Sequence, residues 1–514
     1  MSVAEEPEVR TAAGVVRGRT EDGLAVFRGI PYAEPPIGEA RFQAPRRVRG
    51  WDGVREAFTF GPPAPQDASM AGRGGGDLFK GTGDDWLTVN VWTPDPDPAA
   101  RRPVMVWIHG GAYKHGFSGS PGYDARHIAR EGDVVFVSLN YRLGVEGFAH
   151  IDGAPANRAL LDQVAALEWV RENITAFGGD PGQVTVLGDS AGAGSIAALM
   201  VMPSAAGLFR RAVGQSLPGT FFSDALARDV AAAIAAEAGL RPTAGDLAGV
   251  DPRELPAIGH ALESKMRQHE DRWGSFAHTL TLFSPVVDGE VLPAAPWQAL
   301  AGGAGRDVEL IIGHTRDEFR TFLLFSGQLG KITEDQAGET LRRFGPGEDG
   351  ERAYRAAFPG ASAEELHELV QTDWLFRMPT LRLAEAQAVG GGRAYLYELA
   401  WQSPGNGGVM RACHGLDGPL LFGTYDAHLG PAAIGPEHTA EARELTAQIR
   451  TAWTSFATSG DPGWPAYDSE QRLTRIFDTV PSVAAYPEET SRRLWQDHVF
   501  EALPLLGRID STRP

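Results

Sequence analysis

The chain has 514 residues, of which 43% are hydrophobic and 22% charged, and its formal net charge is −19. This balance is typical of a folded globular protein, and the negative charge argues against nucleic acid or an anionic membrane surface as a partner. Cys413 is the only cysteine, which excludes an intrachain disulfide and a thiolate metal cluster and favours a reducing compartment.

No targeting or membrane signal stands out. The N-terminal residues MSVAEEPEVR lack the basic and apolar regions of a secretion signal, and no apolar run approaches the roughly 20 residues of a membrane span. We therefore expect a cytoplasmic protein without a membrane span. The length allows either several domains or one large α/β unit with insertions. The sequence leaves the oligomeric state open, with a monomer as the default expectation.

Short β-like segments fill the first hundred residues, at 14–19, 24–29 and 86–94, and predict an antiparallel edge. The glycine-rich stretch 72–83 between them is typical of a loop. From Val104 onward the pattern changes to apolar runs of buried-strand length separated by segments of helical spacing, which predicts a mostly parallel sheet. These runs are VMVWI, VVFVSL, VTVL and VELII.

A helix is predicted between the second and third runs, where apolar residues recur at three- and four-residue steps from Leu160 to Val170. On this pattern Asp162, Gln163, Glu168 and Arg171 face outward. Two later segments, 222–300 and 328–385, are rich in helical patterns and are expected to cap the sheet. The sequence thus predicts an α/β fold with helices on both faces of a large sheet.

Ser190 lies in the sequence Gly-Asp-Ser-Ala-Gly, directly after a buried strand and before a helix-compatible run. Such a junction places a nucleophile on a tight, strained turn, and the small residues Gly188 and Gly192 let neighbouring backbone approach it. The following helix directs its partial positive charge at the turn. The alternatives are a simple tight turn or a phosphate loop, although no lysine follows as a phosphate loop requires.

A second glycine pair follows an upstream strand, in the sequence His109-Gly110-Gly111-Ala112. Acyl transfer creates an oxyanion, and unobstructed backbone N–H groups stabilise it. We therefore expect Gly110 and Gly111, together with the amide of Ala191, to form an oxyanion hole, with His109 supporting the turn.

Eight segments in the same order make the chain similar to the type-B carboxylesterases, the α/β-hydrolase family that includes cholinesterases and bacterial p-nitrobenzyl esterases. They are FRGIPYAEPPIGEARFQAP, DDWLTVNVWTPD, VWIHGGAY, NYRLGVEGF, FGGDPGQVTVLGDSAG, SPVVDGEVLP, GHTRDEF and CHGLDGPLLFG. The resemblance covers nearly the whole chain. It implies a single α/β-hydrolase domain over 1–514, no cofactor and a Ser–Glu–His triad.

Carried over to this sequence, the resemblance places the nucleophile at Ser190, the acid at Glu318 and the base at His414. Glu318 follows a predicted strand at the carboxyl edge of the sheet, where catalytic groups of open α/β folds gather. The preceding residue, Asp317, is the alternative candidate for the acid. The histidine is selected by its position alone.

A polar cluster behind the triad is also implied by the resemblance, formed by Gln215, Ser216 and Asp417 together with Asp189. The chain departs from the family pattern at several positions. Asp189 and Asp417 stand where glutamate is usual. Trp86 replaces a cysteine that closes a loop in secreted relatives, and Phe319 replaces the glycine after the acid.

Six apolar side chains in segments that flank the site by resemblance are expected either to line an aromatic-rich substrate pocket or to belong to the core. They are Phe221, Phe222, Phe276, Phe319, Phe322 and Leu323.

These features predict a serine carboxylesterase that hydrolyses small, neutral or cationic esters through an acyl-enzyme. An amidase, carbamate hydrolase, lactonase or thioesterase would use the same machinery. A catalytically silent, cholinesterase-like interaction protein is disfavoured, because serine, acid and histidine are all present. A metallohydrolase is disfavoured too, because the pair His109 and His115 lacks a metal-binding frame.

Overall fold

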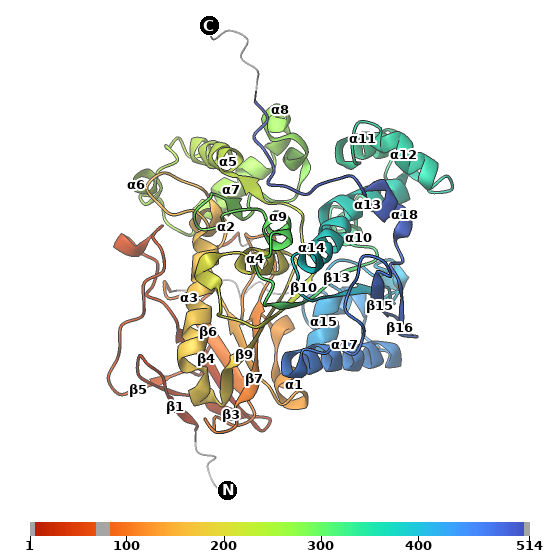
Figure 1. Ribbon diagram of the computed structural model, residues 1–514. Helices are drawn as coiled ribbons and strands as arrows, with labels where there is room; N and C mark the ends of the chain where they lie inside the picture. Colours follow the sequence, from red (N-terminus) through yellow and green to blue (C-terminus); the bar gives the residue numbers. More distant parts are fainter. Residues whose placement is uncertain (1–5, 68–82, 508–514) are drawn as a thin grey trace.

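A computed structural model describes residues 6–67 and 83–507 of the chain. An 11-stranded sheet forms its centre (Figure 1). In spatial order the strands are β16 (Ser482–Ala485), β15 (Leu473–Phe477), β14 (Ala394–Leu399), β13 (Glu309–Thr315), β10 (Arg211–Gln215), β9 (Gly179–Asp189), β7 (Arg102–Ile108), β8 (Val135–Leu139), β6 (Thr88–Thr93), β4 (Leu24–Pro31) and β3 (Arg19–Glu21).

Neighbouring strands run parallel from β15 to β8, while β8, β6, β4 and β3 pair antiparallel, as does β16 with β15. The predicted mostly parallel sheet with an antiparallel N-terminal edge is therefore confirmed. Two smaller sheets join β1 (Glu8–Arg10), β2 (Val15–Arg17) and β5 (Val54–Glu56), and β11 (Phe222–Ser223) with β12 (Val286–Val287).

The register of the central strands positions the site. Asp189 at the end of β9 lies opposite Gln215 at the end of β10, and Gln215 lies opposite Gly313 near the end of β13. The segments that leave these parallel strands therefore start side by side at one edge of the sheet, which is where open α/β folds place their ligands.

Two hydrophobic cores lie on opposite faces of the sheet, because successive side chains of a strand point to opposite sides. In β7, Val106 and Ile108 belong to one core, and Met105 and Trp107 belong to the other. The first core contains residues of α3 (Arg158–Asn173), α4 (Ala191–Leu199), α5 (Asp224–Glu237), α7 (Leu255–Glu263) and α9 (Pro296–Ala301). The second contains residues of α1 (Arg126–Glu131), α15 (Asp417–Phe422) and α17 (Ala440–Ser459).

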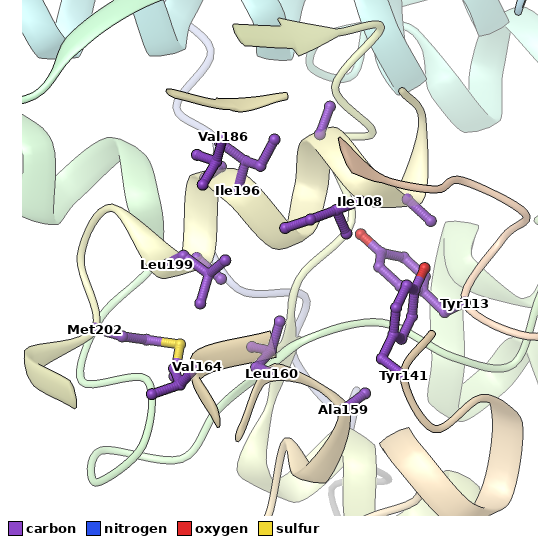
Figure 2. Close-up of a cluster of buried hydrophobic side chains, with 14 of the residues drawn as sticks. Ile108, Tyr113, Tyr141, Ala159, Leu160, Val164, Val186, Ile196, Leu199 and Met202 are labelled. Carbon is purple, nitrogen blue, oxygen red and sulfur yellow. The ribbon is translucent and has the colours of Figure 1, made fainter. Parts of the chain in front are cut away.

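Helix α4, which follows Ser190, is anchored in the first core. Figure 2 shows Ile196 of this helix next to Val186 of β9, and Leu199 further along the helix, above Val164 and Leu160 of α3. Truncating one such buried leucine or isoleucine to alanine costs about 2–5 kcal/mol. The packing therefore fixes the helix, and with it the residue at its N-terminus.

The predicted helix at 160–171 is present as α3, but two of its polar residues were assigned to the wrong face. Asp162 and Gln163 are buried, not solvent-facing, whereas Glu168 and Arg171 are exposed as predicted. Asp162 pairs with the buried Arg142 at 2.7 Å, and the amide of Gln163 donates to Ser195 at 3.2 Å. These bonds compensate the burial of the Asp162 carboxylate and of the Gln163 NH₂ group.

Both segments with helical patterns contain helices, which occupy the upper half of Figure 1. The first holds α5, α7 and α9 with α6 (Ala244–Leu247) and α8 (Glu270–Trp273). The second holds α11 (Glu334–Phe344), α12 (Gly350–Ala357), α13 (Ala363–Thr372), a π-helical turn (Asp373–Arg377) and α14 (Met378–Val389). Helix α14 contributes to the first core beside β13 and β14, so this part of the second segment packs directly on a face of the sheet.

The remaining helices are short: α2 (Gly144–Phe148), α10 (Arg320–Phe325), α16 (Gly430–Ala433) and α18 (Glu489–Leu494). Among the helices described, none has both the length and the apolar character needed to cross a bilayer. The glycine-rich loop predicted at 72–83 lies, apart from Gly83, outside the described residues.

Candidate active site

Ser190 occupies a strained turn between β9 and α4. Its backbone has φ 52° and ψ −121°, a conformation that residues with a side chain rarely adopt. The Ser190 N–H donates to the carbonyl of Gln215 at 2.8 Å, which ties the turn to the neighbouring strand. A Cβ on Gly188 or Gly192 would lie 2.5 or 2.1 Å from the carbonyl oxygen of Ile108. The prediction that small residues permit a close backbone approach here is therefore confirmed.

The turn after β7 differs from the expectation at Gly110. Its N–H donates to Asp189 Oδ1 at 2.9 Å and is therefore occupied. The N–H groups of Gly111 and Ala112 have no acceptor among the described residues. The free N–H groups of this turn are therefore those of Gly111 and Ala112, and not those of Gly110 and Gly111 as expected from the sequence.

Neighbouring carbonyls fix the direction of both free N–H groups, because the C=O and N–H of one peptide unit point in opposite directions. The Gly110 carbonyl accepts from His109 Nδ1 at 2.8 Å, which orients the Gly111 N–H. The Gly111 carbonyl accepts from the N–H groups of Lys114 and His115 at 3.1 and 2.9 Å, which orients the Ala112 N–H.

His109 supports this turn as a neutral ring. It is buried and stacks on Tyr141, with ring centroids 4.4 Å apart. Burial lowers the pKa of His109 to about 4, so the ring is uncharged at neutral pH. Because a carbonyl only accepts, the proton of the neutral ring is on Nδ1. Burial also lowers the pKa of His115, to about 4.

Glu318 and His414 are brought together from segments 96 residues apart. His414 Nδ1 lies 2.5 Å from Glu318 Oε2, and both side chains are buried. Glu318 Oε1 accepts from the Thr315 N–H at 2.9 Å, which holds the carboxylate in place. The rival acid, Asp317, instead accepts from the N–H of Ala412, so it ties the loop of the acid to the segment before His414.

The electrostatics of this pair favour the charged forms. Burial alone would raise the pKa of Glu318, but the adjacent His414, the Ser216 hydroxyl and the Thr315 N–H bring it below its ordinary value. Burial alone would lower the pKa of His414, but Glu318, with smaller contributions from Asp189 and Asp417, raises it. The site is therefore organised to stabilise an imidazolium.

Asp189, the residue before Ser190, interacts electrostatically with His414. Its carboxylate and the imidazole are close enough for each to shift the pKa of the other. Burial and the negative charge of Asp417 raise the pKa of Asp189 to about 6. Within the described part of the chain the Ser190 hydroxyl itself makes no hydrogen bond, to His414 or to any other residue.

The predicted polar cluster lies around this pair. The Tyr397 hydroxyl donates to Asp417 Oδ2 at 3.0 Å, and Asp417 is buried at the start of α15. Gln215 and Ser216 are buried as well, at the end of β10. Burial raises the pKa of Asp417, and the nearby Gln215 amide opposes this shift.

Of the six predicted pocket residues, only Phe322 is seen beside the imidazole. Its ring centroid lies 5.2 Å from that of His414. Phe319 and Leu323 pack with it in a separate buried cluster. The other three are at most 2% exposed in the first core, packed against tryptophans or each other, and do not border solvent. They are Phe221, Phe222 and Phe276.

Phe376 is a site residue that sequence reasoning missed. It lies on the π-helical turn before α14, and its ring centroid is 4.4 Å from that of His414 and 6.0 Å from that of Phe322. Only the general association of π-helical turns with functional sites could have indicated it, and a π turn cannot be read from the residue pattern.

Comparison with known proteins identifies the family of this chain. The carboxylesterase family profile matches residues 5–495. The para-nitrobenzyl esterase of Bacillus subtilis is 36% identical over 94% of this chain and 97% of its own length. The phenmedipham hydrolase of Pseudarthrobacter oxydans is 36% identical over 95% of this chain and 99% of its own.

A solved carboxylesterase structure is similar to this chain in its fold as well. The crystal structure of the Geobacillus stearothermophilus carboxylesterase EST55 at pH 6.2 superposes with a TM-score of 0.83 and 36% identity, covering 95% of this chain and 100% of the other. Because the profile and these relatives span nearly the whole chain, the protein belongs to the carboxylesterase family, the carboxylic ester hydrolases with the α/β-hydrolase fold.

Proposed function

We propose that Ser190, Glu318 and His414 form the catalytic triad of this esterase. The observation that carries the proposal is the 2.5 Å contact between His414 Nδ1 and Glu318 Oε2, together with the electrostatic interaction of His414 with Asp189, the residue before Ser190. Hydrogen bonds at catalytic serines are often long in the absence of substrate, and they tighten in the reacting complex. The free hydroxyl of Ser190 is therefore compatible with this role.

In the first step, Ser190 Oγ attacks the ester carbonyl carbon, while His414 Nε2 takes the hydroxyl proton. The carbonyl electron pair moves to oxygen, and the N–H groups of Gly111, Ala112 and Ala191 stabilise the resulting oxyanion. Glu318 stabilises the imidazolium and keeps the proton of the neutral ring on Nδ1. His414 then returns its proton to the leaving alcohol, and the acyl group stays on Ser190.

In the second step, water attacks the acyl-enzyme. His414 Nε2 accepts a proton from the water, the same amides hold the second oxyanion, and the proton passes to Ser190 Oγ as the acid leaves. The nucleophile is thereby regenerated, and each turnover consumes one ester and one water molecule.

The expected substrates are small neutral or cationic esters. The net charge of −19, with the carboxylates of Asp189 and Asp417 near the imidazole, disfavours anionic substrates. The name of the para-nitrobenzyl esterase suggests arylmethyl esters as the first to try. The cytoplasmic location and the monomeric state expected from the sequence stay predictions.

A panel of p-nitrophenyl esters of increasing acyl length, with p-nitrobenzyl acetate beside it, tests the proposal. Ser190→Ala should lower kcat on the order of a millionfold. Ser195→Ala is the matched control, because it removes a hydroxyl one turn further along α4, where Ser195 accepts from Gln163. Equal turnover by Ser190→Ala and the unmodified protein would contradict the assignment.

Carbamate hydrolysis is a second candidate, favoured by the similarity to a phenmedipham hydrolase. It would use the same serine and oxyanion donors. Phenmedipham and a matched p-nitrophenyl carbamate in the same panel separate the two activities by their kcat/KM values.

A further inference from the structure

The turn that carries the free amides has an unusual backbone. Gly111, Ala112 and Tyr113 follow one another at φ 116°, 54° and 62°. Side chains rarely tolerate such values, so a turn of this kind persists only where its surroundings hold it. Tyr113 is buried and packs against Phe148 at 4.9 Å between ring centroids, and its ring lies in the core shown in Figure 2.

Each of four successive carbonyls in this turn has its own donor. Residues of the turn itself and the first residue of α2 hold three of them: His109 donates to Gly110, the Lys114 and His115 amides donate to Gly111, and Gly144 donates to Tyr113 at 2.8 Å. The fourth, the carbonyl of Ala112, accepts from the Thr281 hydroxyl at 2.8 Å. Thr281 belongs to the helical segment 222–300.

The hydroxyl of Thr281 is itself oriented. Its oxygen accepts from the N–H of Phe283 at 3.2 Å, which leaves the hydroxyl proton for Ala112. A second tie joins the same two segments, because Lys114 Nζ donates to the carbonyl of Leu280 at 2.9 Å and pairs with Glu263 at 2.6 Å. Leu280 and Thr281, which are consecutive residues of the helical segment, therefore contact the two ends of the stretch from Ala112 to Lys114: Thr281 binds Ala112, and Leu280 binds Lys114.

We propose that Thr281 is a positioning residue for the oxyanion hole: its hydroxyl holds the Ala112 carbonyl, which belongs to the peptide unit after the Ala112 N–H, and thereby fixes the left-handed backbone of Ala112 and keeps the turn with its free N–H groups in place for the developing oxyanion. The helical segment thus takes part in transition-state stabilisation and not only in covering the site. This inference rests on the proposed function, because it concerns the same hydrolytic step.

Thr281→Val removes the hydroxyl and keeps the shape. The free amides then relax from their direction, so kcat for p-nitrophenyl acetate falls about tenfold, less than the hundred- to thousandfold loss of a whole donor. KM stays within about twofold, because the ground-state carbonyl makes little use of the amides. Affinity for a trifluoromethyl ketone, which forms an oxyanion on the serine, falls by the same factor as kcat/KM.

Thr281→Ser restores the hydroxyl and should return kcat and inhibitor affinity to within about twofold of the unmodified protein. Ser264→Ala is the control, because its exposed hydroxyl donates to the carbonyl of Ala261 within the same helical segment and does not contact Thr281. If Thr281→Val does not fold, Lys114→Met is used instead, because it removes the contacts of Lys114 with the Leu280 carbonyl and Glu263. It should lower kcat and inhibitor affinity in parallel, by about threefold.

The inference is overturned if Thr281→Val keeps full kcat and inhibitor affinity, if kcat falls while inhibitor affinity does not, or if Thr281→Ser is as impaired as the valine variant. When Thr281→Val does not fold, an unchanged Lys114→Met overturns it. Ser190→Ala is measured alongside. Full activity in that variant would refute the proposed function itself, whereas its loss of activity leaves the results for Thr281 to be judged on their own.

Discussion

Replacing Glu318 by glutamine tests how the pair with His414 works. The amide has the shape of the carboxylate but no charge, and its NH₂ group can donate to the imidazole. If it donates to His414 Nδ1, the ring proton moves to Nε2, which then cannot take the proton of Ser190. The substitution therefore removes both the stabilisation of the imidazolium and the correct tautomer.

The expected loss in kcat is about a thousand- to ten-thousandfold, or roughly 4–5 kcal/mol of transition-state stabilisation. The pH profile changes as well. In the unmodified protein Glu318 raises the pKa of His414 above 6.5, and the reaction needs the neutral ring, so kcat/KM rises with pH through a value above 6.5. Without the carboxylate, burial continues to lower this pKa, so the residual activity should rise at a lower pH.

The assay is the hydrolysis of p-nitrophenyl acetate between pH 5 and 9, with product measured at a wavelength where protonation of p-nitrophenol has no effect. Asp317→Asn is the matched control, because Asp317 is the adjacent carboxylate and does not contact His414 in the described part of the chain. A kcat within tenfold of the unmodified value for Glu318→Gln, with the same apparent pKa, would refute the reasoning.

Two further predictions follow from contacts around Ser190. Asp189→Asn removes a negative charge that helps to raise the pKa of His414, so the rise of kcat/KM should shift to lower pH, and an unshifted pH profile would count against this electrostatic contribution. Gly192→Ala places a Cβ 2.1 Å from the carbonyl of Ile108 and should lower the thermal unfolding midpoint or the soluble yield sharply. Gly245→Ala meets no atom within 4 Å and should leave both unchanged; equal behaviour of the two variants would contradict the close approach.

The parts of the fold that the sequence predicted are those with strong local patterns. The apolar runs at β7, β8, β9 and β13 were long enough to indicate buried strands. Strand β10 was missed, because its sequence RAVGQ contains only two consecutive apolar residues with side chains. Asp162 and Gln163 were assigned to solvent, because a residue pattern does not show that Arg142 and Ser195 meet them in the interior.

The candidate site, like the fold, could be predicted from the sequence only in part. Ser190, Glu318 and His414 were predicted from the family resemblance, and the structure brings the last two together. The shift from Gly110 to Ala112 was not predictable, because glycines suggest free amides, whereas the left-handed backbone of Ala112 is imposed by tertiary contacts. Phe376 and Thr281 reach the site from segments distant in sequence, so no local pattern indicates them.

The central claim is that Ser190 becomes the covalent nucleophile. Diethyl p-nitrophenyl phosphate phosphorylates an activated serine and releases p-nitrophenol, so intact-mass measurement and peptide mapping of the treated protein locate the nucleophile directly. We expect one diethylphosphoryl group per chain, on Ser190, with activity lost in proportion and no adduct on Ser190→Ala. Complete inhibition with Ser190 unmodified, or an adduct on another residue that accounts for the loss, would contradict the account.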